Sequence, residues 1–272
     1  MKFSVLISVY KTEDPQFLEE ALDSIWINQI LKPNEIICVI DGPIPQNLLL
    51  TIDAFKNAVG NKCKIYQLDS NIGLGPALAF GLSKCSFELV ARMDTDDISR
   101  ENRFKSQISR FVANPKLDVL GSNAEEFSVD RSIIDSTRTV PLDHLSIIKK
   151  AKYRNPMNHP SVMYRKSRVL NAGGPQEFIG FDDYYLWIRM INDGSNFANI
   201  DESLVSLRAG SKLIDRRSGI GYIKNELRFQ KYLLSTNFIG YSDFMRNLIV
   251  RVLPRLLPKQ IQWKLYNTFL RN

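Results

Sequence analysis

The sequence of 272 residues contains only three cysteines and two histidines. Cys38, Cys63 and Cys85 are far apart, which excludes a paired-cysteine zinc or redox motif and indicates reduced, buried thiols. A metal site built on two histidines would need both His144 and His159, and His144 falls in an ordinary helix-like stretch. Metal binding through sulfur or imidazole is therefore not indicated.

Long apolar runs are also missing. No uninterrupted run reaches the roughly 18 residues that a membrane-spanning helix needs, so we expect none. The apolar run Phe3–Val9 turns polar at Lys11–Asp14 and is too short for a signal peptide, so we expect a protein of the cytoplasm.

Two common nucleotide-binding signatures are absent as well. There is no G-x-x-x-x-G-K-[ST] loop, and Asn71–Gly75 (NIGLG) lacks the third glycine of G-x-G-x-x-G and follows the third predicted strand. These absences argue against a P-loop and against nicotinamide dinucleotide binding.

What is present is a globular composition with an uneven charge. Hydrophobic residues make up 44% and charged residues 24%, which is typical of one catalytic unit with a proper core. From residue 208 onward there are 13 Lys and Arg against three Asp and Glu, whereas the rest of the chain is slightly acidic. A basic C-terminal quarter suits nucleic acid, anionic lipid or a phosphorylated substrate.

The first half of the sequence alternates strand and helix patterns. Because short apolar runs alternate with amphipathic stretches, we predict an α/β fold with a parallel sheet, helices on both faces and ligands at the carboxyl ends of the strands. The predicted strands are Phe3–Val9, Glu35–Ile40, Lys64–Leu68 and Glu88–Met93, and the predicted helices are Phe17–Asn28, Gln46–Ala58 and Leu74–Lys84.

Later elements are less regular. We predict a helix capped by Ser99 and running to about Phe111, a strand at Leu117–Leu120, and helices near His144–Lys152 and Asp182–Asn192. Two amphipathic helices, Tyr241–Leu253 and Ile261–Leu270, follow at the C-terminus. They either lie in a bilayer interface or pack on the core.

The acidic run Asp94–Asp97 directly follows a predicted buried strand. In an extended chain Asp94 and Asp96 point to one side, where two carboxylates can hold Mg²⁺ or Mn²⁺ and a diphosphate can complete the shell. The alternative is a solvated helix start, with Asp97 as a cap. The sequence has carboxylates at strand ends but neither a P-loop nor a G-x-G-x-x-G motif. This combination indicates a nucleotide-sugar site.

Three further polar groups are candidates. Asp41, before Gly42, either accepts hydrogen bonds from a base edge or forms a simple turn. Asp182 and Asp183 open a helix either as caps or as a general base, since one of two adjacent carboxylates has a raised pKa. His159 either is structural or assists in an acceptor pocket.

Arg216 and Arg217 form an adjacent basic pair in the C-terminal quarter. Such a pair either clamps a leaving diphosphate through bidentate contacts or simply belongs to a solvated loop.

Six segments, taken in order, resemble the successive motifs of bacterial family 2 glycosyltransferases, which build O-antigen, capsule and exopolysaccharide units; the amylovoran type is the most similar. The resemblance covers roughly residues 3–220 and is carried by Ser4–Tyr10, Asp41–Gly42, Asn71–Leu74, Met93–Asp97, His159–Met163 and Asp182–Trp187.

This resemblance implies a GT-A fold, an inverting mechanism, Mn²⁺ or Mg²⁺ as cofactor, and a UDP-sugar donor such as UDP-glucose or UDP-galactose. By position, the nucleotide-sugar would be held by Ser8, Tyr10, Asp41, Asn71, Asp94, Arg216 and Arg217. The metal would be held by Asp96 and Asp94, the base would be Asp183 with Asp182 beside it, and the acceptor would contact His159, Asn158 and Trp187. The chain departs from the family pattern with Asp182 in place of Glu and with Tyr185 where many relatives have Asp.

The resemblance also implies domain limits and partners. We expect a catalytic domain over 1–220, with a nucleotide-sugar half to about 121 and an acceptor half to 220, and a basic helical extension over 221–272. The acceptor would be a sugar on undecaprenyl pyrophosphate, at the inner face of the cytoplasmic membrane. Two alternative functions fit the sequence less well. A nucleotidyltransferase of related fold would need a glycine-rich, basic loop near the first strand, and the sequence has none there. A non-catalytic nucleic-acid or lipid-binding protein has no use for acidic residues at strand ends, because they repel phosphate.

Overall fold

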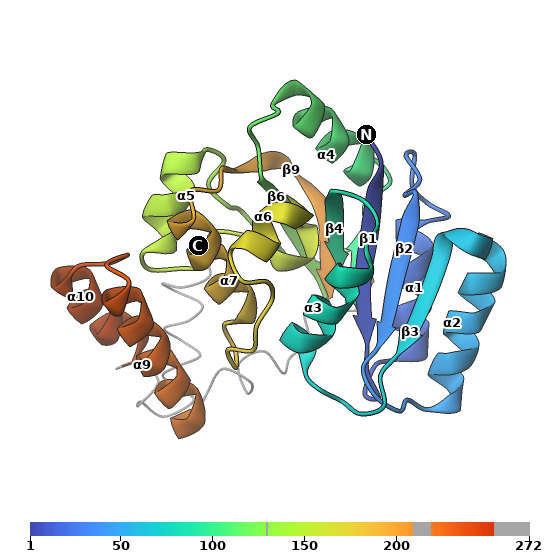
Figure 1. Ribbon diagram of the computed structural model, residues 1–272, viewed down its shortest axis with the longest axis horizontal. Helices are drawn as coiled ribbons and strands as arrows, with labels where there is room; N and C mark the ends of the chain where they lie inside the picture. The colour runs from blue at the N-terminus through green and yellow to red at the C-terminus, as the bar shows by residue number, and fades with distance from the viewer. Residues whose placement is uncertain (129, 209–218, 253–272) are drawn as a thin grey trace.

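The structure is a computed structural model that describes residues 1–128, 130–208 and 219–252 (Figure 1). Its first half is a parallel sheet in the order β3-β2-β1-β4, as the alternating pattern predicted. The strands are β1 (Phe3–Val9), β2 (Glu35–Ile40), β3 (Cys63–Gln67) and β4 (Leu89–Met93). Every residue of β1, β2 and β4 is buried, because helices cover both faces of these strands.

The second half continues the same sheet but reverses direction. Strand β8 (Met163–Arg165) runs antiparallel between β4 and β6 (Val119–Phe127), and β6 pairs in parallel with β9 (Phe197–Arg208). The short strands β5 (Ile98–Ser99) and β7 (Ser136–Arg138) pair antiparallel with β9 and β6. The predicted parallel order therefore holds for the first half, and the second half is mixed.

Two helical layers cover this sheet. One core cluster joins it to α1 (Pro15–Ile25), α2 (Gln46–Val59) and α4 (Arg103–Ala113). The other joins it to α3 (Leu74–Lys84), α5 (His144–Ala151), α6 (Lys166–Asn171) and α7 (Asp182–Asn192). Short 3₁₀ turns lie at Gly60–Lys62 and His159–Ser161.

The predicted helix start at Ser99 is wrong. Ser99 lies in β5, is buried, and donates its backbone N–H to the Ser24 hydroxyl oxygen over 3.0 Å. Helix α4 begins only at Arg103, after Asn102, which makes no side-chain cap bond. Pairing of β5 with β9 takes up the residues that would otherwise extend the helix toward the acidic run.

Helices α9 (Gly219–Ser235) and α10 (Tyr241–Arg251) stand at the end of the molecule away from β3 (Figure 1). Phe229 and Leu233 of α9 pack on α7 and are buried. Within the described ranges no helix is long and apolar enough to cross a bilayer. The second predicted amphipathic helix, at 261–270, lies outside the described residues.

Helix α10 is held to α9 by polar side chains. Arg251 Nε lies 2.8 Å from the Glu226 carboxylate, and Asn247 donates to the Gln230 amide oxygen over 2.9 Å. Glu226, Gln230 and Asn247 are all buried. Phe244 of α10 also packs against the apolar cluster of α7 and α9, whereas four other apolar residues of α10 are exposed: Tyr241, Met245, Ile249 and Val250.

Candidate active site at the carboxyl ends of the parallel strands

The ends of β1, β2 and β4 bring the predicted donor-binding residues to one sheet edge. Ser8 lies in β1 and is nearly buried, and Tyr10, just past its end, is 40% exposed. The backbone N–H of Asp41, after β2, donates to Val9 O over 2.8 Å. Asp94 follows β4, the other neighbour of β1. The parallel topology therefore gathers these residues as the sequence predicted.

Asp41 organises the loop that contains Asn71. Its carboxylate accepts the backbone N–H of Ile72 at 2.8 Å and of Gly73 at 3.1 Å, and the Asn71 side-chain amide at 2.9 Å. Gly42, at φ +86°, lets the chains approach so closely that a Cβ would lie 2.5 Å from the Asn71 nitrogen. Asp41 and Asn71 are thus brought together, and a uracil edge would share Asp41 with this loop.

The acidic run contains three different environments. Asp94 is half-buried, Asp96 is exposed, and Asp97 is only 6% exposed. Burial raises the pKa of Asp97 well above its usual range, and the charges of Asp94 and Asp96 add to this. Burial also raises the pKa of Glu13, whose side chain hydrogen-bonds to Thr95 and is repelled by Asp96 and Asp94. Sequence reasoning missed Glu13, which precedes α1 without any distinguishing motif.

Arg208, at the end of β9, fixes this acidic loop. Its backbone N–H donates to the Asp97 carboxylate over 3.0 Å and its Nε donates to Asp96 O over 3.2 Å. The guanidinium also pairs with Glu20 at 2.6 Å and stacks 3.7 Å from the Phe17 ring centroid. Sequence reasoning missed Arg208 because β9 itself was not predicted.

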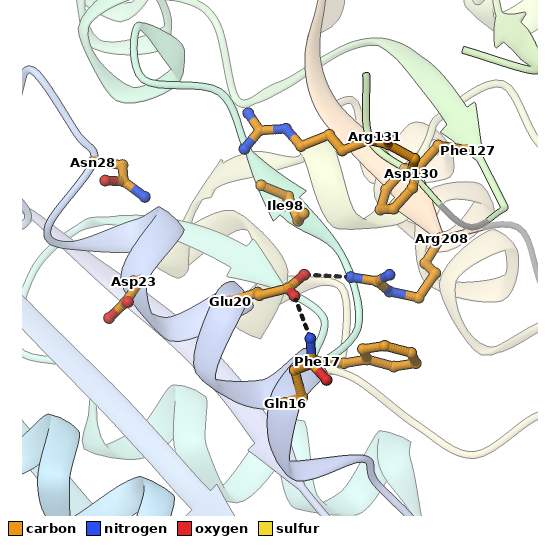
Figure 2. Close-up of a pocket in the computed structure, with 10 residues that line it drawn as sticks. All are labelled: Gln16, Phe17, Glu20, Asp23, Asn28, Ile98, Phe127, Asp130, Arg131 and Arg208. Atoms are coloured by element: carbon orange, nitrogen blue, oxygen red, sulfur yellow. Dashed lines mark hydrogen bonds and ion pairs between the residues drawn. The ribbon is translucent and has the colours of Figure 1, made fainter. Parts of the chain in front are cut away.

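Figure 2 shows the cavity beside Arg208, which has a volume of about 510 Å³. None of the predicted site residues that the structure describes lines it. Its lining residues are Gln16, Phe17, Glu20, Asp23, Asn28, Ile98, Phe127, Asp130, Arg131 and Arg208.

Asp183 stands at the start of α7, in the second half of the sequence. Its Oδ2 accepts the Asn155 side-chain amide over 2.6 Å, and its Oδ1 accepts the backbone N–H of Tyr184 over 2.7 Å. Asp182 instead accepts the backbone N–H of Phe178, and burial raises its pKa, with a smaller contribution from Asp183. The sequence predicted a raised pKa for one carboxyl group of this pair, and that group is Asp182. Its side chain bonds to the backbone of the loop before α7.

His159 and Arg92 connect the two sides. Arg92 lies in β4 and is 1% exposed; its Nε donates to His159 Nε2 over 3.0 Å, and its Nη2 lies 2.5 Å from Asp94 Oδ1. The other nitrogen of His159, Nδ1, is 3.9 Å from Asp183 Oδ2. Asp94 and Asp183 are therefore linked through two intervening side chains. Arg92 was missed, although a lone cation in the apolar run LVARM is an available signal.

The other two predicted acceptor contacts face the interior. Asn158 is 8% exposed and donates its amide to Ser122 O at 2.9 Å and to Arg138 O at 3.2 Å, so it joins β6 to the end of β7. Trp187 is 0% exposed and lies with its ring centroid 6.2 Å from that of His159. A side chain without exposed surface cannot stack on a sugar. Trp187 instead packs beside the His159 ring in the interior.

A divalent metal is compatible with two of the predicted residues. Hard oxygen ligands suit Mg²⁺ and Mn²⁺, and Asp96 presents its carboxylate at the surface next to Asp94. Among the described residues no group of three His, Cys, Asp or Glu could enclose an ion, so a bound diphosphate would have to complete the shell. Arg216 and Arg217 lie outside the described residues.

Comparison with known proteins identifies the chain. The model of the glycosyl transferase family 2 matches residues 4–173. The chain belongs to this family. It is 37% identical over 99% of its length, and 97% of the relative's, to the UDP-Gal:alpha-D-GlcNAc-diphosphoundecaprenol beta-1,3-galactosyltransferase of Escherichia coli. It is 36% identical over 97% of both chains to the amylovoran biosynthesis glycosyltransferase AmsE of Erwinia amylovora. The protein is a glycosyltransferase, as the six motifs predicted.

Solved structures confirm the GT-A-like fold of this glycosyltransferase. S. aureus TarS 1–349 matches 98% of the chain, and 78% of its own, with a TM-score of 0.68 at 16% identity. Its complex with UDP-GlcNAc matches with a TM-score of 0.66 at 16% identity over 98% of the chain and 73% of its own. The mannosyltransferase PcManGT from Pyrobaculum calidifontis, in complex with GDP-Man and Mn²⁺, matches with a TM-score of 0.62 at 14% identity over 98% and 75%.

Proposed function

We propose that this glycosyltransferase transfers a hexose from a UDP-sugar, with inversion, to a sugar hydroxyl of a lipid-pyrophosphate-linked acceptor in surface polysaccharide synthesis. The observation that carries this proposal is the series of contacts that links Asp183 to the acidic loop. An acceptor-side carboxylate lies 3.9 Å from His159, and His159 bonds to the Arg92 that pairs with Asp94. A base on one side and a diphosphate-binding edge on the other are what a direct displacement needs.

In the proposed reaction Asp183 takes the proton of the acceptor hydroxyl. The oxygen then attacks the anomeric carbon on the face opposite UDP, the new C–O bond forms, and the bond to the diphosphate breaks with its electron pair leaving on UDP. One displacement inverts the anomeric carbon, so an α-linked donor gives a β linkage. Asn155, which donates to Asp183 over 2.6 Å, would hold the carboxylate during this step.

The donor would lie along the ends of β1, β2 and β4. Tyr10 and Ser8 would contact uridine, with Asp41 and the Asn71 loop closing the base end. Asp96, with Asp94 beside it, would hold Mn²⁺ or Mg²⁺, which supplies positive charge for the departing diphosphate. Arg216 and Arg217 would add cationic contacts. UDP-galactose is favoured over UDP-glucose because a relative at 37% identity is named for UDP-Gal.

The acceptor would be GlcNAc on undecaprenyl pyrophosphate, as in the name of that same relative, which covers 99% of this chain. His159 stands beside the base and would border the acceptor hydroxyl. Asn158 would hold the backbone next to His159 in place through its two hydrogen bonds to main-chain oxygens. An acceptor of this kind is held in a bilayer, so the enzyme would work at the inner face of the cytoplasmic membrane.

The test is transfer by the purified protein. With Mn²⁺, GlcNAc- and GalNAc-pyrophosphate-lipid acceptors and a panel of UDP-hexoses, we expect UDP release and a hexose-extended product from UDP-galactose on the GlcNAc lipid, and loss of both with EDTA. If the product forms only from another UDP-hexose, that sugar nucleotide is the donor in place of UDP-galactose. Absence of UDP binding under all conditions would refute the proposal as a whole.

Helix α10 supports a peripheral position on the membrane. Its exposed apolar residues, of which Tyr241 is 79%, Met245 54% and Ile249 55% exposed, lie one turn apart, and Arg246 beside them is also exposed. An apolar stripe with an exposed cation beside it suits an anionic bilayer interface.

Charge placed on this stripe tests the membrane contact. We expect Met245→Glu with Ile249→Glu to reduce sedimentation with anionic vesicles, while Leu50→Glu, on the 59% exposed position of α2, has no effect. Equal sedimentation of both variants would refute the membrane contact and leave the reaction untouched.

A further inference from the structure

Arg92 is a cation in the middle of the sheet, and burying it requires partners. Its side chain is 1% exposed. Besides His159 and Asp94, it donates to Leu6 O over 3.3 Å. All of its nitrogens are donors, because arginine has no acceptor atom. Every group that contacts the guanidinium must therefore present a lone pair to it.

This requirement fixes the tautomer of His159. Nε2 accepts from Arg92 Nε at 3.0 Å and so carries no hydrogen. The hydrogen bond from Arg92 Nε requires a neutral ring, because an imidazolium presents only N–H donors, and burial lowers the pKa of His159 in the same direction. The one hydrogen of the neutral ring is then on Nδ1. That atom is buried and has no hydrogen-bond partner within the described part of the chain.

The Nδ1–H has one anion within reach. Asp183 Oδ2 lies 3.9 Å away, about 1 Å beyond a normal hydrogen bond, and Asn155 already donates to the same oxygen. Hydrogen bonds to a catalytic group are often long before substrate binds and shorten in the complex. A small rotation of either side chain would complete this one.

We propose that Arg92 sets His159 as an Nδ1–H donor and that His159 is a positioning residue for Asp183, closing its hydrogen bond when the acceptor binds. This inference rests on the proposed function, in which Asp183 is the base. With Asn155 and His159 both donating to Oδ2, the remaining lone pairs of the carboxylate are aimed at the acceptor hydroxyl. Because Arg92 also pairs with Asp94, one guanidinium aligns the base with the donor edge.

Two substitutions of His159 separate positioning from packing. The amide nitrogen of asparagine occupies about the place of Nδ1, so His159→Asn keeps a donor toward Asp183 but gives Arg92 no acceptor. The amide oxygen of glutamine reaches the place of Nε2, so His159→Gln satisfies Arg92 but provides no donor toward Asp183. His144→Gln is the matched control, since His144 in α5 accepts the backbone N–H of Phe197 over 3.2 Å and contacts none of the residues in the proposed mechanism that the structure describes.

We expect the two His159 variants to rank in opposite orders. His159→Gln should have the higher melting temperature, whereas His159→Asn should keep a kcat about tenfold higher than the Gln variant, at unchanged donor KM and UDP affinity. His144→Gln should retain the parent kcat. Opposite rankings support the inference, and a kcat that follows the melting temperature, or is equal in the two variants, overturns it.

The failure of this inference can be told from the failure of the proposed function. If Asp183→Asn is as active as the parent, Asp183 is not the base and the proposed mechanism fails first. If Asp183→Asn is inactive while the two His159 variants rank alike, only the positioning role of His159 is lost.

Discussion

Asp183→Asn is the substitution that bears most directly on the mechanism. Both carboxylate oxygens accept hydrogen bonds, from Tyr184 N at 2.7 Å and from the Asn155 amide at 2.6 Å. An asparagine keeps one acceptor and turns its NH₂ group toward the other donor. We expect this conflict to cost about 1 kcal/mol of folding stability, since the side chain at position 183 is 26% exposed and water can reach the donor that loses its acceptor.

The loss in turnover should be much larger than the loss in stability. An amide cannot accept a proton at neutral pH, and a positioned base contributes about 10²–10⁴-fold to the rate. That range corresponds to about 3–5 kcal/mol in the activation barrier. Because the proposed mechanism places Asp183 on the acceptor side, the dissociation constant for UDP should stay within about a factor of two of the parent value.

Asp193→Asn is the matched control, because it makes the same chemical change at the exposed C-terminal end of α7. Turnover is measured from product mass with the GlcNAc lipid, UDP affinity by calorimetry, and stability by urea unfolding. A kcat for Asp183→Asn within about threefold of that of Asp193→Asn would refute the base assignment. A parallel loss of UDP affinity would mean that Asp183 contributes to donor binding instead.

Three other perturbations have clear directions. Gly42→Ala should weaken UDP binding, measured by calorimetry, because its Cβ would lie 2.5 Å from the Asn71 nitrogen at a φ of +86°. Burial raises the pKa of Asp182, so the folded state holds this proton more tightly than the unfolded chain; the free energy of unfolding should therefore fall as the pH rises from about 4 through the raised pKa, and Asp182→Asn should make that slope shallower in urea titrations. Glu226→Gln should lower the free energy of unfolding by about 3–5 kcal/mol, because it leaves Arg251, with a side chain 16% exposed, without its carboxylate; a loss below about 1 kcal/mol would contradict this.

The sequence predicted the parallel half of the fold closely. Helix Leu74–Lys84 and strand Phe3–Val9 have the predicted bounds, because both combine a clear apolar period with glycine or polar ends. Strand β9 was missed, since its exposed or partly exposed middle, from Asp201 to Ser203, breaks the apolar pattern. Its pairing with β5 is a long-range contact, which also explains the wrong helix start at Ser99.

The candidate site divides in the same way. Asp94 and Asp41 were found because strand ends are visible in sequence, and the structure places both at one edge. Trp187 was predicted to contact the acceptor but lies in the core. The sequence alone does not show which side of its helix packs on the sheet, because the neighbouring elements are unknown. Arg92 and Asn155 act through contacts 67 and 28 residues away in sequence, which no local spacing encodes.

The antiparallel insertion of β8 between β4 and β6 has a consequence for engineering. Residues 89–91 and 163–165 are bonded across one ladder, so the two halves form a continuous plate without a hinge between them. In the proposed reaction, the spacing between leaving group and nucleophile would thus be set by strand register. New acceptor specificity should be accessible by changing loops on this plate, whereas exchanging residues 122–220 as a cassette between relatives would have to rebuild the β4–β8 ladder to keep the two reacting partners in line.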